Sequence, residues 1–263
     1  MKTLLLATVA MACSVVAAKA EDGFSFGLYG GATLGTETDH QLFGPNESNS
    51  ATSSLDEGTW AGMDFRYHSN GAFFGLGIES INIDQSILWN GSGTPSGAGI
   101  DATIFDLEYG RHVNDNGYWT VGLRHMKLDL TSKIFFNGNG PLHAFEGTGV
   151  RIGYEGKQDN AIGGVSLLGG VGLSVLDGVI KTHDTDIWDC SDCTPTDTTA
   201  VGIDARISAA FQTSESGSIV VGYQAQHWKD VTVEISDDSG FGLNLGTSDI
   251  LVHGPFIGFN TTF

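Results

Sequence analysis

The chain has 263 residues, and its 31 acidic and 12 basic residues give a formal net charge of −19 at pH 7. Such an acidic surface repels phosphates, so we expect no nucleic-acid partner. Gly contributes 38 residues and Pro only 5. Because the Gly is spread through apolar segments, the composition excludes a collagen or a disordered chain.

The N-terminal segment, residues 1–20, has the pattern of a secretory signal peptide. Lys2 gives the basic start, Leu4 to Ala18 the apolar core, and Ala18-Lys19-Ala20 the small-x-small cleavage site. No later stretch approaches the ~20 continuous apolar residues that a membrane helix needs. We expect residues 21–263 to form one domain, and if that domain spans a membrane it does so as a β-barrel.

Ten segments alternate apolar residues with small or polar ones, which is the pattern of half-buried strands. In chain order they are residues 23–36, 57–68, 71–84, 101–113, 118–133, 142–157, 160–181, 199–213, 218–233 and 247–263.

The connections between these segments alternate in length. Four are tight and drawn mostly from Asn, Asp, Gly and Ser: Ser69-Asn70, Asn114 to Gly117, Gln158-Asp159 and Ser214 to Gly217. Five are longer, at residues 37–56, 85–100, 134–141, 182–198 and 234–246. Short periplasmic turns and long external loops are typical of outer-membrane barrels. The sequence predicts an all-β fold, a transmembrane antiparallel up-and-down barrel of about ten strands.

Side-chain alternation separates charged from apolar residues. In segment 101–113, Phe105, Leu107 and Tyr109 share one face, and Asp106 and Glu108 share the other. A soluble β-sandwich predicts the same alternation. Aromatic residues at the segment ends favour the barrel, where such residues form girdles at the membrane interfaces. They are Tyr67, Tyr109, Trp119, Tyr154 and Phe263.

The last segment gives the same indication. It places Leu251, Pro255, Ile257, Phe259 and Phe263 on one face and continues to the final residue, as outer-membrane barrel strands do. We expect the protein in the cell outer membrane, in contact with its lipid and lipopolysaccharide.

The charged residues on the opposite parity are expected to line the lumen. They are Asp64, Arg66, Glu79, Asp106, Glu108, Arg124, Arg151, Glu155, Asp204 and Arg206. They either line an ion-selective path or form a salt-bridged plug. Around eight strands leave an interior just filled by side chains, whereas sixteen to eighteen leave an open channel. Inward Gly residues provide room for a narrow pore, although they also let a neighbouring Tyr lie across the wall.

The fourth long connection contains Cys190 and Cys193, and because the periplasm oxidises thiols we expect a local disulfide. The same segment is acidic, but it lacks the spaced ligands of a calcium loop, so we assign no metal site. Divalent cations are expected as partners of such acidic loops, where they also bridge lipopolysaccharide phosphates. The residues of this segment considered as metal ligands are His183, Asp184, Asp186, Asp189 and Asp192.

No catalytic residue is assigned. His125 and His143 are the nearest candidates, and neither has a recognisable Ser or carboxylate partner in the sequence. We expect no enzyme activity and no cofactor.

Two segments, Phe145 to Gly153 and Gly254-Pro255, resemble the Legionella-type major outer membrane protein family of pore-forming barrels. The resemblance implies a channel for small solutes, with Gly147, Arg151 and their neighbours Gly149 and Gly153 facing the lumen. We therefore predict a porin-like protein that allows passive passage of small solutes or ions through a narrow polar lumen. The alternative is a non-conducting structural or adhesin-type barrel whose external loops bind a surface partner.

Overall fold

The computed structural model describes residues 22–38, 53–87, 96–114, 116–132, 140–162, 164–182, 195–231, 235–236, 244–245 and 249–263. The predicted signal peptide, the pair Cys190 and Cys193, and the acidic residues beside them lie outside these ranges. Within the described residues no helix is long and apolar enough to cross a membrane.

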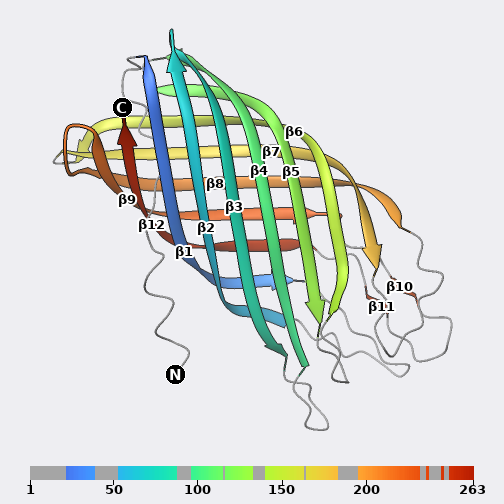
Figure 1. Ribbon diagram of the computed structural model, residues 1–263. Helices are drawn as coiled ribbons and strands as arrows, with labels where there is room; N and C mark the ends of the chain where they lie inside the picture. The colour runs from blue at the N-terminus through green and yellow to red at the C-terminus, as the bar shows by residue number, and fades with distance from the viewer. Residues whose placement is uncertain are drawn as a thin grey trace.

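Ten antiparallel strands form a closed barrel in the order β1-β12-β9-β8-β7-β6-β5-β4-β3-β2 (Figure 1). Closure confirms the predicted all-β barrel and excludes the sandwich, because β1 pairs with both β2 and β12. The strands are β1 Gly23–Thr38, β2 Ser53–Ser69, β3 Ala72–Ile87, β4 Ser96–Asn114, β5 Gly117–Ser132, β6 Gly140–Ile162, β7 Val165–Thr182, β8 Thr196–Gln212, β9 Gly217–Lys229 and β12 Ile250–Thr262.

One small element was not predicted. The segment expected to be a plain loop, residues 234–246, contains a two-stranded sheet of β10 (Ile235–Ser236) and β11 (Asn244–Leu245). Its strands are too short to show an alternation in the sequence.

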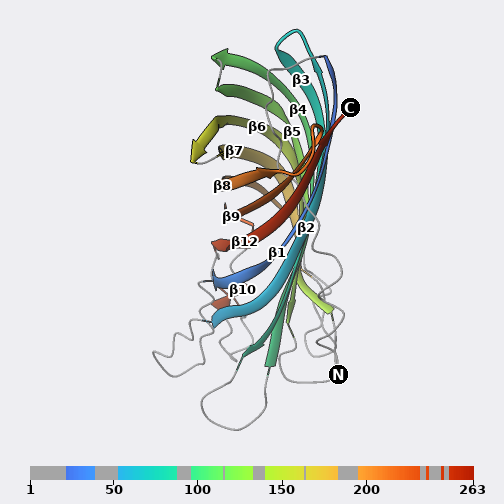
Figure 2. The same cartoon turned by 90° about the vertical axis from the view of Figure 1, so that its left-hand side faces the viewer.

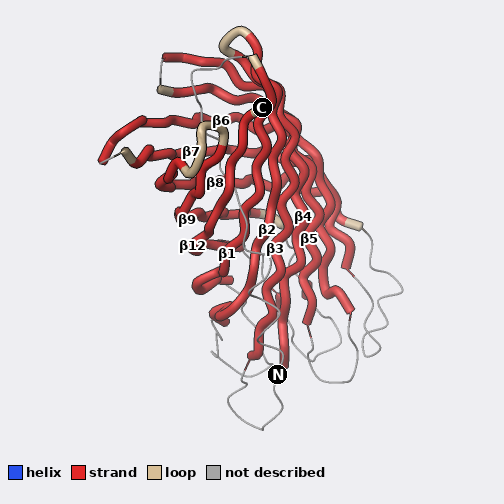
Figure 3. The backbone as a smooth tube through the Cα atoms, turned by 60° about the vertical axis from the view of Figure 1, so that its left-hand side comes forward, coloured by secondary structure: helices blue, strands red, loops and turns tan. Residues whose placement is uncertain are grey.

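The tight turns gather at one end of the barrel, where Figure 3 draws them in tan. We call this the turn end, and the opposite end, where the longer connections leave the strands, the loop end. Asn70 and Gly71 join β2 to β3 with positive φ angles of 52° and 74°, as a two-residue Asn-Gly hairpin turn requires. At the same end, the backbones of Phe24 and Phe263 exchange hydrogen bonds of 2.8 and 3.3 Å that help to close the barrel.

The predicted turn at Gln158-Asp159 is wrong. β6 continues to Ile162, and the turn contains Gly164, whose φ of 89° favours Gly. The register is irregular between Gln158 and Ile162. A β-bulge inserts an unpaired residue into a continuing strand, and the polar residues around Asp159 therefore resembled a turn.

The strands are strongly tilted, so that in Figure 1 the front wall crosses the back wall steeply, and Figure 2 shows the curved wall from the side. Following paired residues from Ser25 once around the barrel leads back to β1 at Thr38. This stagger of about a dozen residues is what closing a ten-stranded sheet into a barrel requires.

The outer wall is apolar, as predicted. The outward side chains are between 42% and 64% exposed in Phe65, Leu107, Val150 and Ile207. Contact of so much apolar surface with water would be unfavourable, whereas contact with lipid is favourable. Tyr67 and Trp119 lie at the turn end and are 42% and 57% exposed, consistent with an aromatic girdle.

On β3, β4 and β5 the apolar residues change face at mid-strand. Phe74 and Leu76 point outward on β3, whereas Ile81 and Ile83, nearer the loop end, are at most 2% exposed. The lumen of the barrel is therefore apolar toward the loop end, whereas its charged residues lie nearer the turn end, where the rings of Phe73 and Tyr118 are also buried.

Candidate functional site

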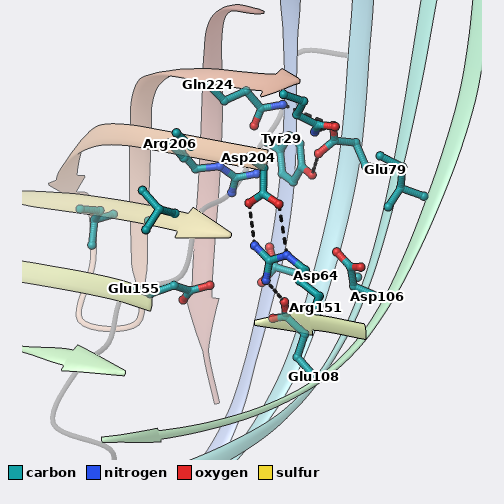
Figure 4. Close-up of a pocket in the computed structure, with 18 of the residues that line it drawn as sticks. Tyr29, Asp64, Glu79, Asp106, Glu108, Arg151, Glu155, Asp204, Arg206 and Gln224 are labelled. Atoms are coloured by element: carbon teal, nitrogen blue, oxygen red, sulfur yellow. Dashed lines mark hydrogen bonds and ion pairs between the residues drawn. The ribbon is translucent and has the colours of Figure 1, made fainter. Parts of the chain in front are cut away.

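The candidate site is the polar half of the lumen. All ten charged residues expected there line one cavity of about 150 Å³. Six are acids and four are arginines, so the cavity is rich in negative charge. Figure 4 labels all of them except Arg66 and Arg124, and shows the labelled side chains converging from strands on opposite sides of the barrel.

Arg151 on β6 is at the centre of this group. Its guanidinium forms an ion pair with Glu108 on β4, and its Nη2 and Nε donate to Asp204 on β8 at 2.7 and 3.2 Å. In Figure 4 it lies between the two carboxylates. Because β6 is a neighbour of neither strand, these contacts pass over the strands between them, β5 and β7.

Arg124 on β5 extends the group. It donates to both oxygens of Asp106, each at 2.7 Å, a bidentate geometry that suits the planar guanidinium. Its Nη1 also donates to Asp204 at 3.0 Å and to Ser174 at 3.2 Å. Asp204 therefore receives hydrogen bonds from two arginines.

Arg66 on β2 closes the third side. It donates to the two oxygens of Glu155 at 2.7 and 2.9 Å, and lies 3.7 Å from Glu108 and 3.9 Å from Asp64. Arg66, Arg124 and Arg151 are at most 9% exposed. Removing charges from water is costly unless each is paired, and here every one of these guanidinium groups contacts at least two carboxylates.

Glu79 on β3 forms a second cluster, which charge alone did not predict. It accepts hydrogen bonds from Tyr29 on β1 and from Gln226 and Gln224 on β9. The side chain of Arg206 lies 4.6 Å from the centre of the Tyr29 ring, a cation–π contact. The alternation of the strands places Tyr29 and the two glutamines on the inner face, and this was the available sequence signal. Their residue types did not distinguish them from other inward residues.

Inward glycines make these long side chains fit. Along one paired row, Arg66, Glu108 and Arg151 alternate with Gly75 and Gly122 on the strands between them. Alternating large and small residues allows side chains to lie across the wall of a narrow barrel. The volume that suggested room for a pore is therefore occupied by neighbouring side chains.

Two inward glycines provide a matched test. A Cβ at Gly202 would overlap the Trp228 ring, whereas a Cβ at Gly77 would meet nothing closer than 3.6 Å. We expect Gly202→Ala to cost about 1–3 kcal/mol of unfolding free energy through overpacking, and Gly77→Ala to be nearly neutral. Urea unfolding in detergent micelles measures both, and equal stability of the two variants would show that the inward space is empty.

The loop-end half of the lumen is filled by apolar side chains, none more than 4% exposed. They belong to one cluster: Trp60, Ile81, Ile83, Ile100, Ala102, Met126, Leu128, Phe145, Leu176, Ile180, Ala200, Trp228, Ile250 and Val252. The lumen thus has two successive layers of side chains, one ionic and one apolar.

The histidines do not form a recognisable catalytic group in the described ranges. His125 lies on the outer wall, where its ring contacts Thr148 at 2.8 Å. Ser25 Oγ and His68 Nε2 are 3.1 Å apart inside the barrel, but His68 Nδ1 has no hydrogen-bond partner and Ser25 is 2% exposed. The pair lacks the carboxylate that orients a catalytic histidine. Among the described residues no group of three His, Cys, Asp or Glu side chains is placed to hold a metal ion.

The closed ten-stranded wall and its apolar outer face decide the class of fold. This is an outer-membrane β-barrel. A similar solved structure is the outer membrane protease OmpT from Escherichia coli, with a TM-score of 0.50 and 11% sequence identity, covering 92% of this chain and 97% of that chain. At this identity the likeness is one of fold alone.

Two other solved structures have lower scores. The translocator domain of the autotransporter NalP from Neisseria meningitidis has a TM-score of 0.48 and 9% identity, covering 93% of this chain and 90% of that chain. The toluene transporter TbuX from Ralstonia pickettii has a TM-score of 0.33 and 12% identity, covering 93% and 78%. No protein-family model matches the sequence, and no curated protein matches it.

Proposed function

We propose that this protein is a non-conducting outer-membrane barrel that anchors its external segments and presents them to a partner at the cell surface. The observation that supports the proposal is the filled lumen. Arg151 connects β4, β6 and β8 across the polar half, and nearly inaccessible side chains such as Phe145 and Met126 occupy the apolar half. A solute would have to displace both layers to pass.

A narrow pore is the second candidate. The acid-rich cavity of about 150 Å³ favours it, since a cation can be accommodated there. The resemblance of the segment around Arg151 to pore-forming barrels supports the same candidate. In that case the apolar layer acts as a hydrophobic gate that opens to water.

Epitope insertion tests presentation at the surface. We expect a tag placed in residues 183–194 to be labelled by antibody on intact cells, because long connections of such barrels are external. The matched control carries the same tag at Ser214 to Ser216, in the turn between β8 and β9. It should be labelled only after the outer membrane is permeabilised, and the reverse pattern would refute the proposed orientation.

Liposome swelling tests closure separately. Vesicles containing the refolded protein and placed in an isotonic solution of a small sugar are expected to swell no faster than protein-free vesicles. Swelling that grows with the amount of folded protein would overturn the non-conducting proposal and favour the pore.

A further inference from the structure

A groove of about 680 Å³ runs across the lipid-facing side of β6, β7, β8 and β9 near the turn end. Its floor is the sheet backbone, exposed where the outward residues are small. The small residues occupy paired positions on neighbouring strands: Gly156 on β6 faces Gly169 on β7, and Ala205 on β8 faces Ala225 on β9. Larger outward residues border the floor: Tyr154, Leu167, Val171, Ile207 and Tyr223.

The groove is apolar along its length and polar at one end. Asn116, Lys157 and Gln158 line it beside the turn-end connections. The Lys157 ammonium lies 2.6 Å from the Asp159 carboxylate, so this end carries both charges of an ion pair. Trp119 on β5 and Tyr154 on β6, whose rings are 5.6 Å apart, lie at the level of the aromatic girdle beside this end of the groove. The polar end therefore lies where lipid head groups meet the hydrocarbon.

The groove is continuous with the lipid-facing wall. Val171 and Ile207, on its border, are 57% and 64% exposed on the same face that contacts hydrocarbon elsewhere. A second copy of the chain fits less well, because a two-fold dimer would place the same hollow opposite itself and leave the space between unfilled. A flexible hydrocarbon chain can fill the hollow of one barrel.

We propose that this groove is a binding site for one glycerophospholipid of the periplasmic leaflet. One acyl chain lies over Gly169 and Ala205, and the head group contacts Asn116 and Gln158. The turn end faces the periplasm in barrels of this type, where the membrane lipids are glycerophospholipids. The site is independent of whether the lumen conducts.

Filling the groove tests the proposal. A Cβ at Gly169 meets no atom closer than 3.8 Å, so the backbone there accepts a side chain, and Gly169→Phe is expected to place its ring in the groove. Ala32→Phe is the matched control, because Ala32 is an exposed residue on the outer face of β1. Each protein is refolded in vesicles of phosphatidylethanolamine and phosphatidylglycerol, transferred to detergent and analysed by native mass spectrometry. Ala205→Leu is a second groove variant if Gly169→Phe does not fold.

The expected result is a retained phospholipid mass on the wild type and on Ala32→Phe, and its loss on the groove variants. Equal retention by all folded proteins, or a wild type that carries only detergent, would overturn the proposal. A wild-type dimer that the groove variants dissociate would also overturn it, since the occupant would then be a second copy.

Discussion

Arg151→Ala is expected to lower the free energy of unfolding by about 3–5 kcal/mol. The substitution leaves the carboxylates of Glu108 and Asp204 without the guanidinium that lies between them. Arg151 is only 9% exposed, so after the substitution bulk water screens the two carboxylates poorly. Urea unfolding of the refolded barrel in micelles, followed by tryptophan fluorescence, measures the loss.

Two further variants show whether unpaired charge is the cause. Arg111→Ala removes an arginine from the exposed turn end of β4 and should change stability little. Adding Glu108→Gln to Arg151→Ala should recover part of the loss, because one unpaired carboxylate is neutralised. A loss for Arg151→Ala no larger than that for Arg111→Ala would contradict the proposed ionic layer.

Phe145→Ala should cause a comparable loss in the other layer, about 3–5 kcal/mol. Phe145 is fully buried in the loop-end lumen, and its ring occupies the space beside Gly147 and Gly178. The substitution therefore leaves a cavity that a barrel wall cannot close by shifting. The same urea experiment measures the effect.

The matched control is Phe105→Ala on the outer wall, where Phe105 is 47% exposed. Lipid or detergent fills the space left there, so no cavity remains and the loss should be clearly smaller. If Phe105→Ala were the more damaging change, the apolar layer would contribute little to the stability of the barrel.

Much of the wall could be predicted from local alternation. Because side chains in a strand point to alternate faces, the charges of segment 101–113 identified the inner face without knowledge of the fold. The inward position of Asp106 and Glu108 followed directly, and the cavity lining agrees with it. The misplaced turn at Gln158-Asp159 shows the limit of this approach, since a bulge and a turn share polar residues.

The contents of the lumen depend on pairings between distant strands. That Arg151 meets Asp204, or that Trp228 occupies the space beside Gly202, follows from register and stagger, which one sequence does not specify. One local signal for the apolar layer was present. On β3 the apolar residues change from the face of Phe74 to the face of Ile81 at mid-strand, and this change indicates an apolar loop-end lumen.

Single-channel recording in a planar bilayer tests the closed lumen most directly. The wild-type protein, shown to be folded by its heat-sensitive mobility on a gel, is predicted to give no discrete conductance steps under a salt gradient. Discrete steps with cation selectivity would contradict the account. Such steps would mean that the acid-rich cavity opens through the apolar layer to form a pore.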